Sequence, residues 1–125
     1  MDLEGIDHVA LSVQDVEKAA QWYIAVLGFK PLHQGMWDRV PVFIGTGTTA
    51  LALFPARSQP DAGSPAAIRM LHLAMRADRK NFLAAQEELN QRDIKFEFQD
   101  HEISHSIYFH DPDGHILEIT TYDLE

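Results

Sequence analysis

Three residues of this chain have the types and positions that could hold a metal ion. His8 and His72 each lie in a segment of alternating apolar residues, and Glu118 lies in a third such segment. Two imidazoles and one carboxylate suit a divalent first-row metal, and on one side of the ion they leave about three coordination positions open. Those positions could take two neighbouring substrate oxygens, together with water or dioxygen. The ion would stay a net cation and act as a Lewis acid.

Strand periodicity places these three residues on polar faces. Side chains alternate between the two faces of a strand, so His8 shares a face with Ala10, as His72 does with Ala74. Each segment also has an apolar face that can pack under a helix. Taken singly, each of these residues is more simply explained without a metal. A strand histidine is more often a hydrogen-bonded polar residue, and a lone glutamate such as Glu118 is usually solvated. Their occurrence on corresponding strands of a repeat favours the metal site.

The composition excludes several classes of function. The chain has 125 residues, 46% of them hydrophobic, which is enough for one domain with a buried core. It has no cysteine, which excludes a disulfide scaffold, a thiolate zinc site and a cysteine nucleophile. Ten basic against nineteen acidic residues give a net charge of −9, which argues against nucleic-acid and anionic-membrane partners. No apolar run approaches the roughly 20 residues that span a bilayer, so we expect a cytoplasmic protein.

The elements that must position these residues occur twice in the same order. In the first half we predict a strand, a helix with N-cap Asp15 and C-cap Gly28, and three further strands. The second half repeats this order, and its last turn contains Pro112 and Gly114. The predicted strands are 5–13, 29–33, 38–44, 49–54, 68–76, 94–98, 104–110 and 115–122.

This pattern predicts an α+β fold of tandem β-α-β-β-β modules within a single domain, 1–125. Module 1 covers about 1–54 and module 2 about 68–125. Residues 55–67 contain three prolines and form the predicted linker.

The chain resembles a known superfamily at both ends. The opening Asp7-His-Val-Ala-Leu11, the ending Tyr108-Phe-His-Asp-Pro-Asp-Gly-His-Ile-Leu-Glu118 and the paired modules are similar to vicinal-oxygen-chelate proteins. That superfamily includes glyoxalase I, extradiol dioxygenases, fosfomycin-resistance thiol transferases and bleomycin-binding proteins. The resemblance implies curved mixed sheets around a metal-binding cleft, with His8, His72 and Glu118 as ligands of one ion. It also implies a homodimer, which in some members exchanges modules between chains.

Differences between this chain and the individual subfamilies narrow the choice among their functions. Glyoxalase I uses a fourth ligand, and matching Gly47 with Gly114 places Leu51 at the position of Glu118, where residues 48–54 offer no ligand. Fosfomycin-type transferases share a tyrosine at the position of Tyr108 but expect a polar residue where this chain has Ala10. Bleomycin-binding proteins lack the metal ligands.

The segment 100–109 resembles the stretch that supplies a histidine and a tyrosine beside the metal ligands of extradiol dioxygenases. By that match His101 would hydrogen-bond an intermediate and Tyr108 would contact the substrate oxygens, with His105 as a competing candidate. A further histidine that dioxygenases carry late in the first module is absent, since none lies between His33 and His72.

We therefore predict a metal-dependent enzyme for a small molecule with two adjacent oxygens, most specifically an extradiol-type dioxygenase. Its ion would be Fe(II), with Mn(II), Zn(II) or Ni(II) as alternatives. The alternative functions are a glyoxalase-like lyase or isomerase, a fosfomycin-type thiol transferase, and a non-catalytic protein that binds a small ligand.

Overall fold

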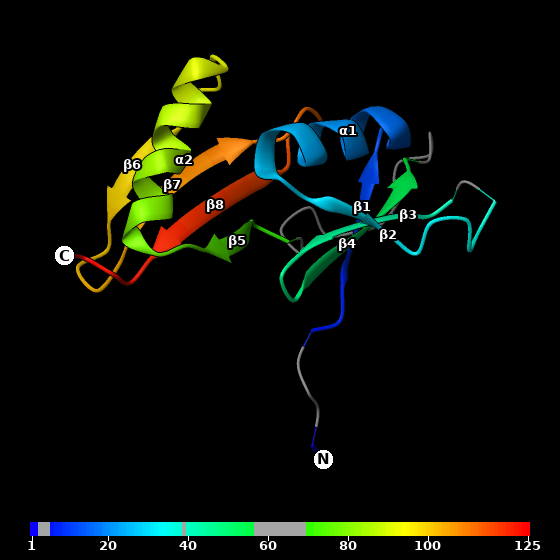
Figure 1. The fold of residues 1–125 in the computed structure, drawn as a ribbon, viewed down its shortest axis with the longest axis horizontal. Helices are drawn as coiled ribbons and strands as arrows, with labels where there is room; N and C mark the ends of the chain where they lie inside the picture. The colour runs from blue at the N-terminus through cyan, green and yellow to red at the C-terminus, as the bar shows by residue number, and fades with distance from the viewer. Residues whose placement is uncertain (3–5, 39, 57–69) are drawn as a thin grey trace, which may run out of the picture. The chain divides into compact units, whose positions relative to one another are not determined.

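The chain forms two compact units, residues 1–62 and 63–125. The computed structural model describes residues 1–2, 6–38, 40–56 and 70–125, and we describe each unit by itself. Each described unit has the element order β-α-β-β-β (Figure 1). The α+β class and the internal repeat predicted from the sequence are thus confirmed. No helix in the described part of the chain is long and apolar enough to cross a membrane.

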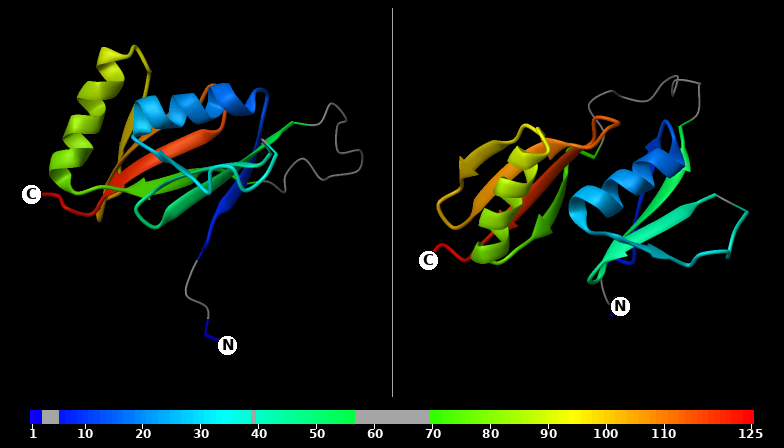
Figure 2. Two further views of the ribbon diagram at one scale, coloured as in Figure 1. Left: turned by 45° about the vertical axis from the view of Figure 1, so that its right-hand side comes forward. Right: turned by 45° about the horizontal axis from the view of Figure 1, so that its top comes forward.

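The first unit is a four-stranded sheet with one helix on it. Its elements are β1 (Val9–Val13), α1 (Val16–Leu27), β2 (Lys30–Leu32), β3 (Val42–Thr46) and β4 (Thr49–Pro55). The strand order is β1-β4-β3-β2, with β1 parallel to β4 and the other pairs antiparallel. Helix α1 packs on β3 and β4 (Figure 2). The core includes Tyr23 of the helix together with Ile44 and Leu53 of the sheet, all fully buried.

Local sequence explains where α1 begins and ends. The side chain of Asp15 accepts a hydrogen bond from the backbone N–H of Lys18 at 3.1 Å, as expected of an N-cap. Gly28 has a φ of 72°, and its N–H bonds to the carbonyl of Tyr23, so this left-handed C-cap favours glycine. In β3, a Cβ at Gly45 would lie 2.8 Å from the backbone oxygen of Thr49. Glycine therefore lets β3 and β4 approach at this point.

The second unit has the same topology. Its elements are β5 (Leu73–Arg76), α2 (Arg79–Gln91), β6 (Glu97–Asp100), β7 (His105–His110) and β8 (Ile116–Thr121). The order β5-β8-β7-β6 again places a parallel pair, β5 with β8, beside two antiparallel pairs. Helix α2 packs on β8 and buries Phe82 and Leu89. Asp78 is its N-cap, accepting from the N–H of Asn81 at 2.8 Å.

Several predicted element boundaries are wrong. The first strand begins at Val9 rather than at residue 5, and Ile6 is 80% exposed. Likewise β5 begins at Leu73, and Leu71 before it is 63% exposed. Apolar alternation continues past the end of the neighbouring strand, so it does not show where pairing starts. Pro55, assigned to the linker, is the last residue of β4, and linker positions 57–67 lie outside the described residues.

The observed register also corrects the internal alignment. Ala10 pairs with Ala52 in unit 1, as Ala74 pairs with Glu118 in unit 2. The counterpart of Glu118 is therefore Ala52, and not Leu51 as the glycine match suggested. The cause is the last turn, because two residues join Thr46 to Thr49 whereas residues 111–115 join β7 to β8.

Candidate metal centre

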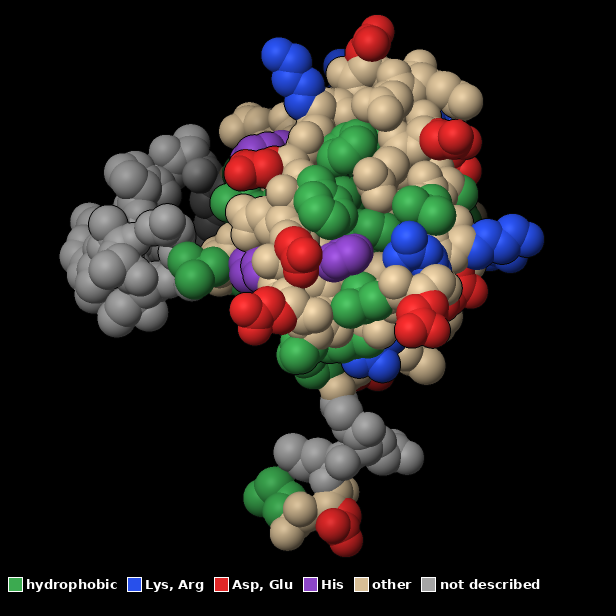
Figure 3. Space-filling view, turned by 90° about the vertical axis from the view of Figure 1, so that its left-hand side faces the viewer, with side chains coloured by type: hydrophobic (Ala, Val, Ile, Leu, Met, Phe, Trp, Pro, Cys, Tyr) green, Lys and Arg blue, Asp and Glu red, His purple; other side chains and the backbone are tan. Residues whose placement is uncertain are grey.

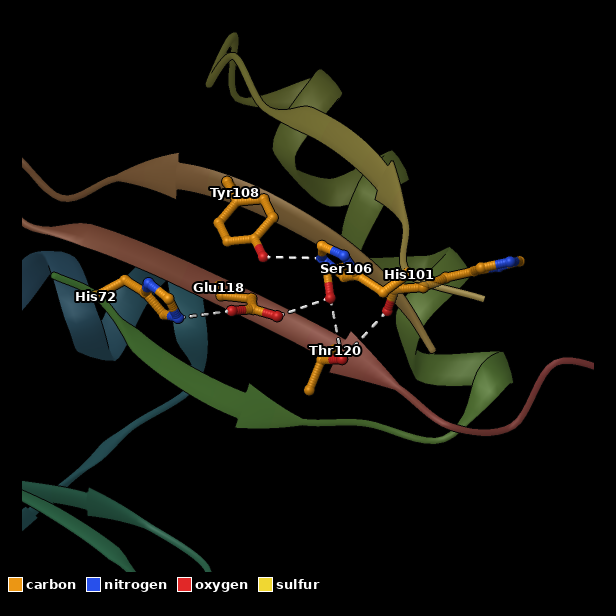
Figure 4. Close-up of polar contacts among 7 residues, drawn as sticks. His72, His101, Ser106, Tyr108, Glu118 and Thr120 are labelled. Carbon is orange, nitrogen blue, oxygen red and sulfur yellow. Dashed lines mark hydrogen bonds and ion pairs between the residues drawn. The ribbon is translucent and has the colours of Figure 1, made fainter. Parts of the chain in front are cut away.

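Glu118 lies in the middle of its sheet. On β8 it pairs with Ala74 of β5 on one side and with Tyr108 of β7 on the other, and only 7% of the residue is exposed. Its Oε1 lies 3.0 Å from Nε2 of His72 (Figure 4). A buried carboxylate is costly unless it has partners. The pair with His72 supplies one of them and brings an imidazole nitrogen and a carboxylate oxygen together.

Ser106 supplies the second partner of the carboxylate. Its hydroxyl, fully buried on β7, donates to Oε2 of Glu118 at 2.7 Å and lies 3.0 Å from the hydroxyl of Thr120. The Thr120 hydroxyl also lies 3.3 Å from the carbonyl of His105, to which it can donate. The Ser106 hydroxyl, with the Thr120 hydroxyl beside it, thus holds Oε2 in place, and Oε1 stays directed at His72.

Tyr108 and His101 form a second pair beside this carboxylate. Nε2 of His101 lies 3.0 Å from the Tyr108 hydroxyl, and the Tyr108 ring lies edge-on to His72, with centroids 5.8 Å apart. The pKa of Tyr108 is raised above its ordinary value, first by partial burial and then by the negative charge of Glu118, whereas the hydrogen bond with Ser106 lowers it. The phenol therefore keeps its proton at neutral pH and can donate it in a hydrogen bond.

His105, the competing candidate, belongs to another cluster. Its Nε2 lies 3.6 Å from Oδ1 of Asp100, and its ring is 5.2 Å from that of Phe98. The structure thus brings His72, Glu118, Tyr108 and His101 together within unit 2 and gives His105 different neighbours.

His8, the remaining predicted ligand, belongs to unit 1 and directly precedes β1. Its Nδ1 lies 2.8 Å from Oδ2 of Asp7, which leaves Nε2 available. Its ring lies 5.1 Å from that of Phe43. Phe43 pairs with Ala52, as Tyr108 pairs with Glu118. The contact of a histidine with a strand aromatic therefore occurs in both units, but on the strand paired with that aromatic unit 1 has Ala52 where unit 2 has Glu118.

The donor set fits a divalent metal ion. Imidazole nitrogen and carboxylate oxygen are ordinary ligands of first-row divalent ions, and a carboxylate on the far nitrogen, such as Asp7 on His8, orients a ligating ring. Within the described residues no three His, Cys, Asp or Glu side chains form one cluster. The structure therefore joins two of the three predicted ligands and places the third in the other unit.

Histidine–carboxylate pairs are common in this acidic protein. Figure 3 shows histidine side chains next to acidic ones on one face, and His115 Nδ1 lies 2.6 Å from Oδ2 of the buried Asp111. The Asp111 carboxylate also accepts the backbone N–H groups of Asp113 and His115, so it closes its own turn. Glu118 differs, because its Oε1 points at an imidazole outside any turn. That difference makes Glu118 the better candidate for a ligand.

Sequence reasoning missed two parts of this site. Ser106, which fixes the carboxylate, and Thr120 beside it are not among the site residues predicted from the sequence. The available signal was the alternation that puts Ser106 on the face of Tyr108. In unit 1, Phe43 was not singled out, although it alternates with the buried Ile44.

Comparison with known families decides the ancestry of the chain. The family model for the Glyoxalase/Bleomycin resistance protein/Dioxygenase superfamily matches residues 5–119. The chain belongs to this superfamily. Members of the superfamily are typically enzymes that depend on a divalent metal and act on small molecules.

Similar proteins include two transferases and two solved structures. The metallothiol transferase FosB of Staphylococcus epidermidis is 27% identical over 128 residues, covering 100% of this chain and 87% of that protein. FosB of Staphylococcus saprophyticus is 29% identical, covering 98% of this chain and 80% of that protein. A glyoxalase/dioxygenase from Nostoc punctiforme has a TM-score of 0.78 and 25% identity, covering 99% and 94%. A lactoylglutathione lyase from Agrobacterium tumefaciens has a TM-score of 0.76 and 22% identity, covering 97% and 96%.

Proposed function

We propose that this protein is a metal-dependent enzyme acting on a small molecule through two adjacent oxygens. Its divalent ion would be held by His72, Glu118 and His8. The observation that carries this proposal is the 3.0 Å contact between His72 Nε2 and Glu118 Oε1, with Oε2 fixed by Ser106. The ion would supply Lewis-acid stabilisation of charge that develops on the bound oxygens.

The Tyr108–His101 pair supports extradiol-type oxygenation as the first candidate reaction, with Fe(II) as the ion. The phenol of Tyr108 would donate a hydrogen bond to a substrate oxygen. His101, whose Nε2 meets that phenol at 3.0 Å, would exchange a proton between Tyr108 and solvent. A proton-transfer residue of this kind contributes about 10²–10⁴-fold to rate.

Thiol transfer with Mn(II), Zn(II) or Ni(II) is the second candidate. The FosB relatives, which the chain matches over nearly its whole length, support it, and the same three ligands would serve. The glyoxalase-type reaction has less support, because the counterpart of Glu118 in unit 1 is Ala52 and a fourth ligand is missing there.

Metal analysis tests the shared part of the proposal. We expect about one Fe, Mn, Zn or Ni per chain in protein purified without a histidine tag. The ion should be lost from His72→Ala, Glu118→Gln and His8→Ala but kept by the matched control His105→Ala. Dioxygen uptake with catechol, against thiol consumption with an epoxide, then separates the two reactions. Protein that neither contains nor binds these ions would contradict the enzyme and favour a non-catalytic binding protein.

We also propose that the chain forms a homodimer, as superfamily members typically do. Sedimentation equilibrium of the full chain tests this directly. A monomer at all accessible concentrations would contradict it.

A further inference from the structure

Unit 1 carries four rings joined by contacts, which we call the aromatic cluster: His8, His33, Trp37 and Phe43. Phe43 is central. Trp37 stacks on it with centroids 5.2 Å apart and planes 25° apart, while His8 and His33 lie steeply inclined to it at 5.1 and 5.3 Å. Stacked and edge-to-face pairs of this kind hold rings in defined orientations. Trp37 nevertheless stays 45% exposed, so part of its surface is available to a ligand.

A cavity of about 310 Å³ adjoins this cluster. Its wall comes from the end of β2, the segment that follows it, β3 and the side of α1, and includes His33, Trp37 and Phe43 together with Ile24. The volume lies at the lower end of small-molecule pockets, about 300–1,000 Å³. An apolar cavity of roughly 150 Å³ already accommodates benzene. This cavity therefore has room for a ring with one or two substituents.

The chemistry of the wall selects the kind of molecule. The described residues that line the cavity include no Lys, Arg, Asp or Glu, and Gln34 and His33 are its polar side chains. A charged group placed against these described residues would lose hydration without gaining a counter-charge from them. A flat ring, by contrast, can stack on or meet the edge of an exposed aromatic side chain. The described part of the wall thus favours an uncharged aromatic group over an anionic or a purely aliphatic one.

We infer that this cavity binds the uncharged aromatic ring of a small molecule, with Gln34 and His33 available to hydrogen-bond a substituent on it. One member of the cluster, His8, which contacts Phe43, is also the proposed metal ligand of unit 1. The ring would then belong to the substrate whose two oxygens reach the ion. This last step rests on the proposed function, whereas binding of the ring itself needs no metal.

The test compares three probes on the metal-free full-length protein by isothermal titration calorimetry. Catechol is flat and neutral, cyclohexane-1,2-diol has the same two oxygens on a puckered ring, and benzoate is flat and anionic. We expect catechol to bind about three- to tenfold more tightly than either of the others, the size of one or two aromatic contacts. Equal affinity for catechol and the diol would overturn the inference.

Variants locate the binding. Trp37→Leu and Phe43→Leu should each weaken catechol binding about three- to tenfold, and Phe43→Tyr, which keeps the ring, should restore it. Trp22→Phe is the matched control, because Trp22 on α1 contacts Tyr23 and does not line the cavity. Should Phe43→Leu fail to fold, the half-exposed Trp37 still decides the question. Undiminished catechol binding by Trp37→Leu would overturn the inference.

The outcomes separate this inference from the proposed function. Ring binding by a protein that takes up no metal would contradict the proposed enzyme and leave the aromatic site standing. Metal uptake, without preference for catechol over the diol in the metal-free protein, would contradict the aromatic site and leave the proposed enzyme standing.

Discussion

At the scale of single residues, the candidate site is organised around one buried carboxylate. Glu118 meets a ligand-type nitrogen with one oxygen and a serine hydroxyl with the other. Because Ser106 occupies Oε2, the carboxylate presents Oε1 alone on the side of His72. Metal affinity depends on the groups that hold a ligand in place, in addition to the ligands themselves. Ser106 should therefore matter to metal binding without touching the ion.

Replacing Ser106 tests this role. We expect Ser106→Ala to weaken metal binding about 10- to 100-fold, the usual effect of losing a group that orients a ligand. Ser106→Thr, which keeps the hydroxyl, should retain most of the affinity. Ser104→Ala is the matched control, since Ser104 is also buried but directly precedes β7. Calorimetric titration with Mn(II) measures the effect, and unchanged affinity in Ser106→Ala would contradict it.

The raised pKa of Tyr108 predicts a specific pH dependence in the metal-free protein. Partial burial and the Glu118 charge favour the protonated phenol and so raise its pKa above the ordinary value of 10.0. The folded state thus holds this proton more tightly than the unfolded chain, so the resulting stability is complete below pH 10.0 and declines as the pH rises through the folded pKa. We expect Glu118→Gln to lower the Tyr108 pKa and Ser106→Ala to raise it.

Tyrosinate absorbance during alkaline titration measures both shifts. Tyr108→Phe assigns the transition, and Tyr122→Phe serves as the control tyrosine. A Tyr108 transition that does not move in Glu118→Gln would contradict the assigned cause.

At the scale of elements, the sequence predicted order and helix caps well and strand ends poorly. Caps are local, since the predicted caps Asp15 and Gly28 act on backbone groups within a few residues. Strand ends and register depend on a partner strand that the local pattern does not contain. The exposed Ile6 and the misplaced counterpart of Glu118 both follow from this. That Tyr108 and Glu118 lie on the polar faces of their strands was predictable because alternation fixes faces, whereas the bond from Ser106 needed the register of β7 against β8.

The two helix ends give a paired stability prediction. Gly28 after α1 has a φ of 72°, and Asp93 after α2 has a φ of 56°. This left-handed region costs most residues about 1–2 kcal/mol, and aspartate tolerates it better than most but less well than glycine. Gly28→Ala should therefore destabilise the protein by about 1 kcal/mol, and Asp93→Gly should stabilise it by up to about 1 kcal/mol. Urea denaturation followed by circular dichroism checks both. Gly114 has a φ of 89° in a turn, so Gly114→Ala should also destabilise the protein and shows the cost of a positive φ away from a helix end.

At the scale of the whole molecule, the two units share a topology but differ in chemistry. Unit 1 offers the aromatic cluster, which includes the proposed ligand His8, and an alanine at the position of the carboxylate. Unit 2 offers an imidazole, a carboxylate and the polar chain through Ser106 and Thr120. The two proposals thus assign recognition of an uncharged ring to unit 1 and polar chemistry to unit 2. A fold built from two similar halves can evolve such a division because each half keeps its own core.

The proposed ligand set predicts that metal binding couples the stability of the two units. Both tryptophans, Trp22 and Trp37, lie in unit 1, so tryptophan fluorescence reports the unfolding of that unit. At about 100 times its dissociation constant a ligand adds about 2.7 kcal/mol to the free energy of unfolding of whatever it holds. If His8 shares the ion with His72 and Glu118, Mn(II) should stabilise unit 1 by about this amount, and Glu118→Ala in unit 2 should abolish the gain.

Because His8 is partly exposed, its replacement separates the effect of metal binding from the stability of the metal-free fold. The side chain of His8 is 41% exposed, so His8→Ala should leave the metal-free midpoint nearly unchanged and remove only the increase caused by Mn(II). His105→Ala should keep that increase. An Mn(II) shift seen by circular dichroism but not by tryptophan fluorescence would show that the ion binds in unit 2 without His8, and would contradict the three-ligand site. A shift that survives Glu118→Ala would remove that carboxylate from the ligand set, because unit 1 would then hold the ion by other groups.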